Sequence, residues 1–236
     1  MKEINLTPRL QRLADAVPQG ARLADVGTDH AYLPAYLLLR GRIERAVATD
    51  INEGPLERAA RTVADCGLTG RVSLRLCDGL AAVSAEETDT VVIAGMGGET
   101  MIAILSAAPW TRDGNHRLLL QPMTKLPELR AWLSASGYAI AREHLVSERG
   151  TYYVVMEVEA GESMPLDKAD CFTGVSFGGD PLYGAYLDEL QGKLAHVRQG
   201  LERAQRADAL SQRAELCALE AAVARRRKEW EHAAGL

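Results

Sequence analysis

Cysteine is scarce in this chain, and long hydrophobic runs and an excess of positive charge are absent. The four cysteines among 236 residues lie far apart, without a CxxC pair or metal-ligand spacing, which excludes a disulfide scaffold and a zinc motif. No run approaches the roughly 18 apolar residues of a membrane-spanning helix, and the N-terminus has no basic-then-apolar pattern, so we expect a cytoplasmic protein without a membrane partner. A net charge of −5 gives no general attraction to nucleic acid, so RNA binding would need local patches.

A complete dinucleotide-binding glycine pattern is also missing from the most informative stretch, residues 22–34. Its sequence predicts a short apolar strand, a sharp turn at Gly27 and then a helix. The free N–H groups at such a helix start, together with the helix dipole, favour a polar or anionic ligand. Asp29 and His30 stand where the G-x-G-x-x-G motif would have further glycines, which brings side-chain chemistry into the turn.

Strand and helix patterns alternate along residues 1–160, which we predict to be one α/β domain. After a short helix that follows Pro8, strands are predicted at 23–26, 46–50, 72–77, 89–94 and 117–121, the last broken by Pro122, and helices at 32–40, 52–66, 99–107 and 126–136. Two further strands, 138–146 and 151–159, are joined by four residues, too few for a crossover helix, so we expect an antiparallel hairpin. The result is an open, doubly wound, mostly parallel sheet with one reversed strand.

The pattern changes in the C-terminal quarter of the chain. Residues 161–183 contain glycine and proline without a clear period and are predicted to be a linker. In residues 184–236, apolar side chains recur in steps of three and four, which is typical of a coiled-coil seam. We expect a C-terminal helical coiled-coil hairpin with a turn near 207–211. One continuous helix is the alternative, because no glycine or proline marks a break.

Polar and glycine residues follow each predicted parallel strand, at the edge where doubly wound sheets bind ligands. Asp50 follows Gly27 by 23 residues, close to the spacing at which a carboxylate meets a ribose diol, and Asp78 ends the next strand, where it could accept from an adenine amino group. The pocket therefore suits a nucleoside with a compact polar extension, such as S-adenosylmethionine. The candidate cofactor-binding residues are Asp25, Gly27, Asp29, His30, Asp50, Ile51, Asp78, Gly79, Gly95, Met96, Gly97 and Gly98.

Three motifs together resemble one known family. The string Asp-Val-Gly-Thr-Asp-His-Ala-Tyr-Leu-Pro at 25–34, Gly-Met-Gly-Gly at 95–98 and Gln-Pro at 121–122 are similar to the bacterial tRNA (adenine-22-N1)-methyltransferases, TrmK. The likeness covers about residues 9–159 and extends to the helical C-terminal region. It implies a Rossmann-like class I S-adenosylmethionine-dependent methyltransferase that modifies an adenine in the D-loop region of tRNA. On this reading neither a metal nor a protein partner is required.

Such a reaction suggests roles for individual residues. Methylation at N1 makes the adenine cationic, so a carboxylate beside the methyl donor, Asp29, would stabilise the developing charge or accept an amine proton. His30 and Tyr32 would orient the base or the methionine end of the cofactor. The candidate substrate contacts are Gln121, Pro122, Arg225, Arg226 and Arg227.

Each candidate also has a structural interpretation. Asp25 could brace the turn, Asp29 could cap the helix, His30 could be a structural histidine, and the basic run at 225–228 could be a solvated helix face. For the whole chain, the alternatives are a methyltransferase for another RNA position or a small molecule, a non-catalytic RNA- or protein-binding module, and a nicotinamide oxidoreductase. The missing glycines and the final hairpin disfavour the oxidoreductase.

Overall fold

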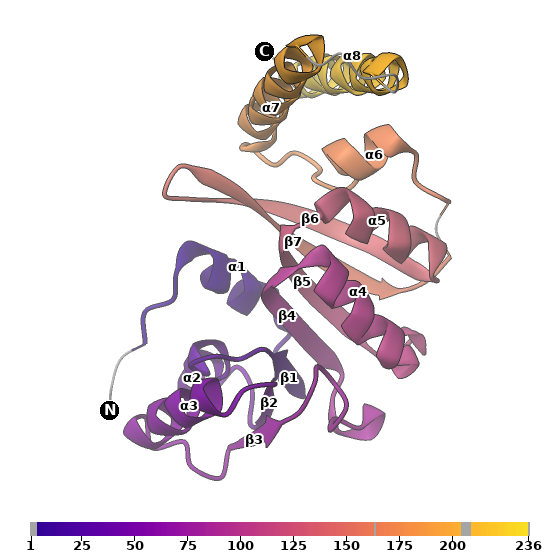
Figure 1. Cartoon of the computed structure of the whole chain (residues 1–236). Coiled ribbons are helices and arrows are strands. Elements are labelled where there is room, and N and C mark those ends of the chain that lie inside the picture. Colours follow the sequence, from indigo (N-terminus) through magenta and orange to yellow (C-terminus); the bar gives the residue numbers. More distant parts are fainter. Residues whose placement is uncertain (1–3, 163, 204–208, 236) are drawn as a thin grey trace.

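A computed structural model describes residues 4–162, 164–203 and 209–235, and a single sheet organises these residues (Figure 1). Seven strands pair in the order β3-β2-β1-β4-β5-β7-β6. The strands β1 to β5 are parallel, whereas β7 is antiparallel to both of its neighbours. This confirms the predicted Rossmann-like sheet with one reversed strand. The strands are β1 (Leu23–Val26), β2 (Ala46–Asp50), β3 (Val72–Leu76), β4 (Thr90–Gly97), β5 (Arg117–Thr124), β6 (Tyr138–Glu148) and β7 (Thr151–Ala160).

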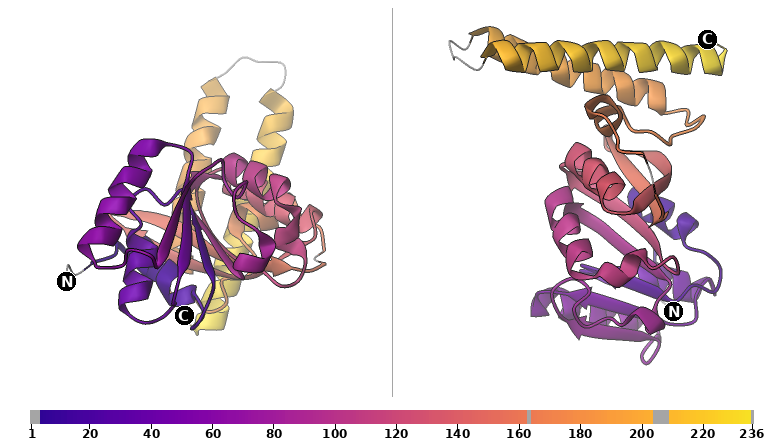
Figure 2. Two further views of the ribbon diagram at one scale, coloured as in Figure 1. Left: turned by 90° about the horizontal axis from the view of Figure 1, so that it is seen from below. Right: turned by 90° about the vertical axis from the view of Figure 1, so that its right-hand side faces the viewer.

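Helices cover both faces of the sheet, which explains the continuous apolar run at residues 91–94 in the central strand β4. In β4, Val91 and Ile93 face one hydrophobic core, while Val92 between them faces the other. The views in Figure 2 show the sheet between these two helical layers. The first layer contains α1 (Pro8–Ala16), α2 (Tyr32–Leu39) and α3 (Glu53–Asp65), and the second contains α4 (Gly98–Ala107) and α5 (Leu126–Ala135). Short 3-10 turns lie at η1 (Ala85–Glu87) and η2 (Pro109–Arg112).

The strands β4 and β5 are longer than expected. The prediction ended β4 before a glycine turn and broke β5 at Pro122, but the two strands continue together to Gly97 and Thr124. Register shifts on either side of Met96 account for this, since a bulge tolerates both a proline and the positive φ of 76° at Gly95. The last residues of the two strands, Gly97 and Thr124, are paired with each other.

The hairpin of β6 and β7 closes through a two-residue turn. Arg149 and Gly150 have φ angles of 53° and 78°, the left-handed conformation that the tightest hairpin turns require. Both strands are therefore longer than the four-residue connection suggested, and the hairpin extends beyond the rest of the sheet (Figure 1).

The C-terminal helices form a hairpin that packs on the sheet domain (Figure 2). The hairpin consists of α7 (Tyr183–Arg203) and α8 (Ala209–Ala234), and the short helix α6 (Lys168–Thr173) precedes it. Gly184 lies against Trp230, and Arg213 donates to the carbonyl of Leu201 at 2.9 Å, so α7 and α8 are antiparallel. The expected turn near 207–211 lies partly outside the described residues, and α8 has begun by Ala209.

The segment expected to be a linker differs from that prediction because it contains α6. Asp167 begins this helix by accepting a hydrogen bond from the N–H of Asp170 at 2.7 Å. Phe177, Tyr183 and Tyr186 join the hydrophobic core that α4 and α5 share with the sheet. In the described ranges, no helix is both long and apolar enough to cross a membrane.

Candidate active site

The carboxyl ends of the parallel strands meet beside the turn that follows β1. The N–H groups of Gly27 and Thr28 both donate to the carbonyl of Thr49, at 2.8 and 3.0 Å, which fixes this turn against the end of β2. A cavity of about 290 Å³ opens between the turn, the end of β4 and α1. From the predicted site residues it brings together Asp25, Gly27, Asp29, His30, Tyr32, Gly95 and Gln121.

Asp25 is a buried carboxylate at the floor of this cavity. The hydroxyl of Thr28 donates to its Oδ2 at 2.6 Å, so Asp25 does brace the turn. Burial raises the pKa of Asp25 from 3.8 to about 6, and the Thr28 hydrogen bond offsets only part of that effect. Because the charged form is poorly solvated, a cation placed beside Asp25 would gain more than at an exposed acid.

The turn after β1 is tightly coiled. Gly27 has a φ of 71°, and a Cβ there would lie 2.1 Å from the Cε of Met96, so glycine suits both the left-handed backbone and the close packing of Met96. Asp29 and Ala31 also have positive φ angles, 49° and 53°. Ala31 occupies the N-cap position of α2, and therefore Asp29 does not cap the helix.

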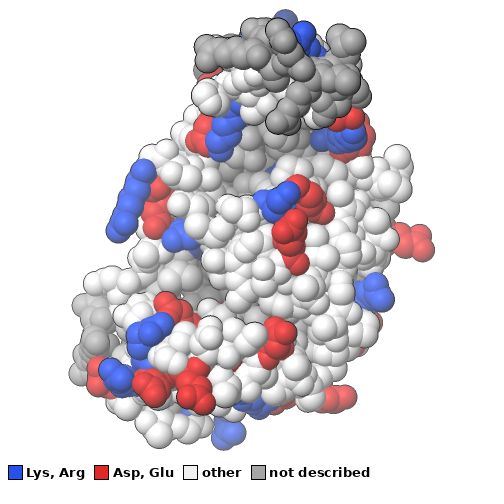
Figure 3. All heavy atoms as spheres, in the orientation of Figure 1, with Lys and Arg blue, Asp and Glu red and all other residues white. Residues whose placement is uncertain are grey.

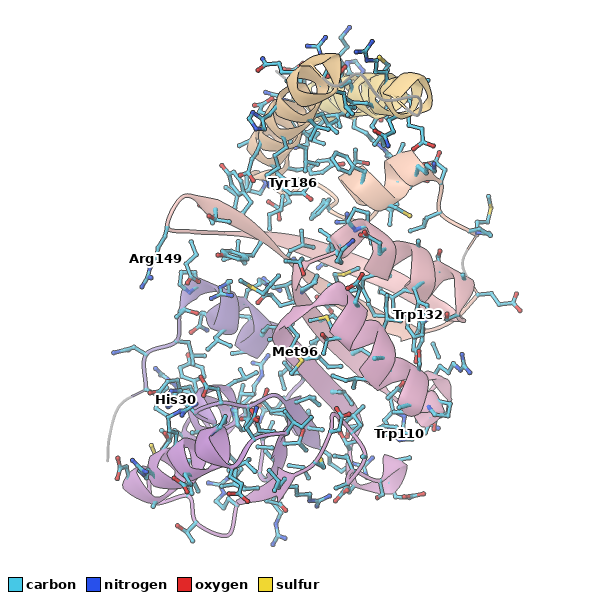
Figure 4. The ribbon with its side chains drawn as sticks, viewed as in Figure 1. His30, Met96, Trp110, Trp132, Arg149 and Tyr186 are labelled. Carbon is cyan, nitrogen blue, oxygen red and sulfur yellow. The ribbon has the colours of Figure 1, made fainter. Side chains whose placement is uncertain are left out.

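The side chain of Asp29 points out of the turn, where 57% of it is exposed. Arg58 on α3 holds one carboxylate oxygen of Asp29 with its Nη2 at 2.5 Å and its Nε at 3.2 Å. The ring of His30 stacks on that of Tyr32 at a centroid distance of 4.9 Å, with an angle of 4° between the planes. His30 is labelled in Figure 4 beside the start of α2. The turn thus presents a carboxylate and a flat aromatic pair together.

The residues expected to hold a nucleoside lie next to this cavity rather than in it. Asp50 is buried at the end of β2, with its Oδ1 accepting from the N–H of Asn52 at 2.9 Å. Ile51 follows it with 62% of its surface exposed. Asp78 is exposed and lines a separate hollow beside α4, while Gly79 is buried against Ile104.

The glycines at the end of β4 and the start of α4 have different roles. Gly95 lines the cavity, whereas Met96 packs its tip against Gly27 (Figure 4). A Cβ on Gly98 would lie 2.5 Å from the carbonyl oxygen of Lys125. Gly98 therefore permits α4 to start against the connection between β5 and α5, and the structure places it in packing rather than in the cavity.

Arg9 is a site residue that the sequence analysis missed. Its Nη1 donates to Oε1 of the buried Gln121 at 3.3 Å, and the Nε2 of Gln121 donates to the carbonyl of Pro122 at 3.0 Å. Arg9 also contacts Glu148 at 3.2 Å and stacks over the ring of Tyr153 at 4.5 Å. The only sequence signal is weak, because an arginine in the first turn of a helix is mildly unfavourable beside the positive end of the helix dipole.

The basic run on α8 is only partly available to a ligand. Arg226 forms an ion pair with Asp170 at 2.5 Å, and Arg227 forms one with Asp188 at 2.9 Å. Both arginines thus hold α8 to neighbouring helices. Arg225 and Lys228 are the exposed members of the run.

The strand order and the cavity at the strand ends define a Rossmann-type methyltransferase domain, and the methyltransferase-domain family matches residues 6–156. The tRNA (adenine(22)-N(1))-methyltransferase of Bacillus subtilis strain 168 is 38% identical over 79% of this chain and 76% of its own length. The chain belongs to the bacterial tRNA (adenine-22-N1)-methyltransferase family.

Solved structures agree with this assignment. The crystal structure of B. subtilis TrmK, an m1A22 tRNA methyltransferase, is similar with a TM-score of 0.81 and 29% identity, covering 95% of this chain and all of that one. A Streptococcus pneumoniae protein described as a tRNA (m1A22) methyltransferase, in complex with S-adenosyl-L-methionine, gives a TM-score of 0.81 and 34% identity, covering 94% of this chain and 100% of that one. Among the residues that the structure describes, no group of three or more His, Cys, Asp or Glu is placed to hold a metal ion.

Proposed function

We propose that this chain transfers a methyl group from S-adenosylmethionine to N1 of adenine 22, in the D-loop region of tRNA. The observation that carries the proposal is the turn after β1. It places a buried carboxylate, an exposed carboxylate and a stacked aromatic pair around one cavity, in a chain that belongs to this enzyme family. The bound cofactor supplies a methyl group that a positively charged sulfur already activates.

The residues around the strand ends fit this cofactor. The cavity beside Gly27 and Gly95 would hold the methionine end, and the Asp25 carboxylate that lines it would stabilise the positive charge there. Asp50, whose position follows the turn along the sheet edge, would accept from the ribose diol. The exposed face of Ile51 offers an apolar surface for the adenine ring, and Asp78 would accept from its amino group.

The acceptor base is proposed to enter beside Asp29. N1 lies on the pairing edge of adenine, so the base must leave its stack or pair before it reaches the methyl group. The His30 and Tyr32 rings give it a flat surface, and Gln121, fixed by Arg9, also lines the cavity. Asp29 would stabilise the positive charge that develops on the base, while catalysis depends mainly on alignment.

The direct test uses unmodified tRNA transcripts, labelled S-adenosylmethionine and a transcript in which adenine 22 is replaced. We expect 1-methyladenosine, identified by mass spectrometry, in the first transcript and none in the second. Label in both transcripts would assign a different position. Cofactor binding without transfer to tRNA would assign a different acceptor.

Asp29→Asn tests the catalytic carboxylate. Asparagine is nearly isosteric and tolerates the positive φ of this position, so the turn should persist. We expect kcat to fall by roughly 10²-fold, the usual effect of removing one group that stabilises transition-state charge, while the Kd of S-adenosylmethionine stays within about threefold. Single-turnover kinetics and calorimetry measure the two quantities. An unchanged kcat would remove Asp29 from the chemistry.

A further inference from the structure

A second cavity, of about 360 Å³, lies between the sheet domain and the C-terminal helices. One wall is the end of β5 and the start of α5, another is β7, and the third is α7. Tyr186 of α7 stands at this junction in Figure 4, edge-on to Tyr152 of β7 with 6.5 Å between the ring centroids. The groove therefore exists only because the helical hairpin packs beside the β6–β7 hairpin.

The lining of this groove is apolar and aromatic, with two lysines at its edges. Met123 and Val197 are among the few large apolar side chains with more than two fifths of their surface exposed. Lys125 and Lys193 are exposed, and their pairs with Glu128 and Glu189 are surface ion pairs that a phosphate can replace at little cost. Figure 3 shows this side of the molecule, where charged side chains stand in small groups on a largely uncharged surface.

This combination is the chemistry of a single-stranded nucleic-acid site. Aromatic and apolar side chains accept the faces of unstacked bases, and separate cations accept the phosphates between them. A cavity of this size accommodates a base but not a duplex. A protein partner would instead meet a larger and flatter surface.

The groove lies next to the active-site cavity, and Arg9 contacts residues that line each of them. Arg9 donates to Gln121 in the cofactor cavity, and the same guanidinium contacts the Sδ of Met123 at 3.2 Å and the ring of Tyr153, both of which line the groove. A tRNA strand whose target base lies beside Gln121 would therefore place its neighbouring nucleotide in the groove.

We propose that this groove binds an unstacked tRNA nucleotide adjacent to the target adenine, and this inference rests on the proposed function. Tyr152 and Tyr153 contact its base from β7, while Lys125 and Lys193 contact the flanking phosphates. The C-terminal hairpin then contributes to substrate binding by forming a wall of the groove, and the basic run on α8 is not required for it.

Val197→Glu tests this surface with a closely matched control. Glutamate suits an exposed helical position, so α7 should persist, but its charge would repel a phosphate in the groove. We expect the Kd and the KM for tRNA to rise about tenfold, with the Kd for S-adenosylmethionine unchanged. The control, Gln199→Glu, adds the same charge to an exposed position of α7 outside the groove and should leave both values near wild type.

The outcomes separate this proposal from the proposed function. Equal effects of the two substitutions, or no effect of either, would overturn the groove as a tRNA site. If wild-type protein binds tRNA without forming 1-methyladenosine, and Val197→Glu alone weakens that binding, then the groove is supported as a tRNA site and the proposed methylation site is wrong.

Lys193→Gln should also make the slope of log Kd against log salt shallower by about 0.7, whereas Lys168→Gln, outside the groove, should not.

Discussion

Asp25→Asn should make this protein more stable at neutral pH and should weaken its binding of S-adenosylmethionine. Folding removes the Asp25 carboxylate from water, and its pKa rises from 3.8 to about 6 as a consequence. A rise of about two units corresponds to about 3 kcal/mol of unfolding free energy lost when the group is ionised. Asparagine keeps an oxygen for the Thr28 hydroxyl and carries no charge to desolvate. Its unfolding free energy near pH 7.5 should therefore exceed that of wild type by up to about 3 kcal/mol.

The unfolding free energy of the wild-type protein should depend on pH, and the raised pKa of Asp25 gives the direction of that dependence. Between pH 3.8 and about 6 the folded state holds a proton on Asp25 that the unfolded state releases, so wild-type stability falls as the pH rises through this window. The asparagine variant lacks that contribution. The difference between the two proteins should shrink from about 3 kcal/mol near pH 7.5 to about 1 kcal/mol near pH 4.5. Urea unfolding of the ligand-free proteins at both pH values measures it.

The same substitution should weaken cofactor binding. The proposed ligand is cationic, and losing a charged partner of this kind costs about 1.5–3 kcal/mol, so its Kd should rise roughly ten- to 100-fold. Asp78→Asn is the control for stability, because Asp78 is exposed and its replacement should change the unfolding free energy by less than about 0.5 kcal/mol. An asparagine variant that is less stable than wild type at both pH values would contradict the desolvation argument.

The order of elements could be predicted because each depends on local pattern. Residues 91–94 are apolar without a break, as expected of a strand covered on both faces, and the short link before Thr151 excludes a crossover helix. The turn at Gly27 could also be predicted, because a glycine between a predicted strand and a predicted helix indicates a tight turn. The side chains at that turn could be predicted to lie together because a parallel sheet brings the carboxyl ends of its strands to one edge.

Contacts between distant segments could not be predicted in this way. Arg9 meets Gln121 across 112 residues, and its position in α1 does not indicate this partner. Glu143 shows a second reason. Strict alternation from Tyr138 would turn Glu143 outward, but a register shift between Ile140 and Arg142 turns it into the core. A bulge leaves no mark in the hydrophobic pattern that precedes it.

Because Glu143 points into the core, it forms a buried ion pair with Arg130 close to the C-terminal helical region. Arg130 of α5 and Glu143 of β6 have fully buried side chains, and the Arg130 Nε donates to Glu143 at 2.7 Å. Burial disfavours the charge on Arg130, but Glu143 more than compensates, and the pKa of the guanidinium lies above its usual value. Arg130 also donates to the carbonyl of Cys171, and Glu143 accepts from the N–H of Val175 at 2.8 Å. The pair therefore joins the sheet domain to α6 and the segment leading to α7.

Arg130→Met should lower the unfolding free energy by about 3–5 kcal/mol, because it leaves Glu143 charged, buried and without its cation. Adding Glu143→Met should recover only part of this loss, since the carbonyl of Cys171 and the N–H of Val175 would then lack their partners. Lys168→Met, which breaks the exposed pair with Glu215, should cost less than about 0.5 kcal/mol. Urea unfolding gives these energies, and tRNA KM should rise in the Arg130 variant more than the cofactor Kd does. A cost near that of Lys168→Met would show that the buried pair does not hold the helical hairpin in place. The groove between β7 and α7 would then have to be maintained by the hydrophobic packing of the C-terminal helices, which includes Tyr152, Tyr183 and Tyr186.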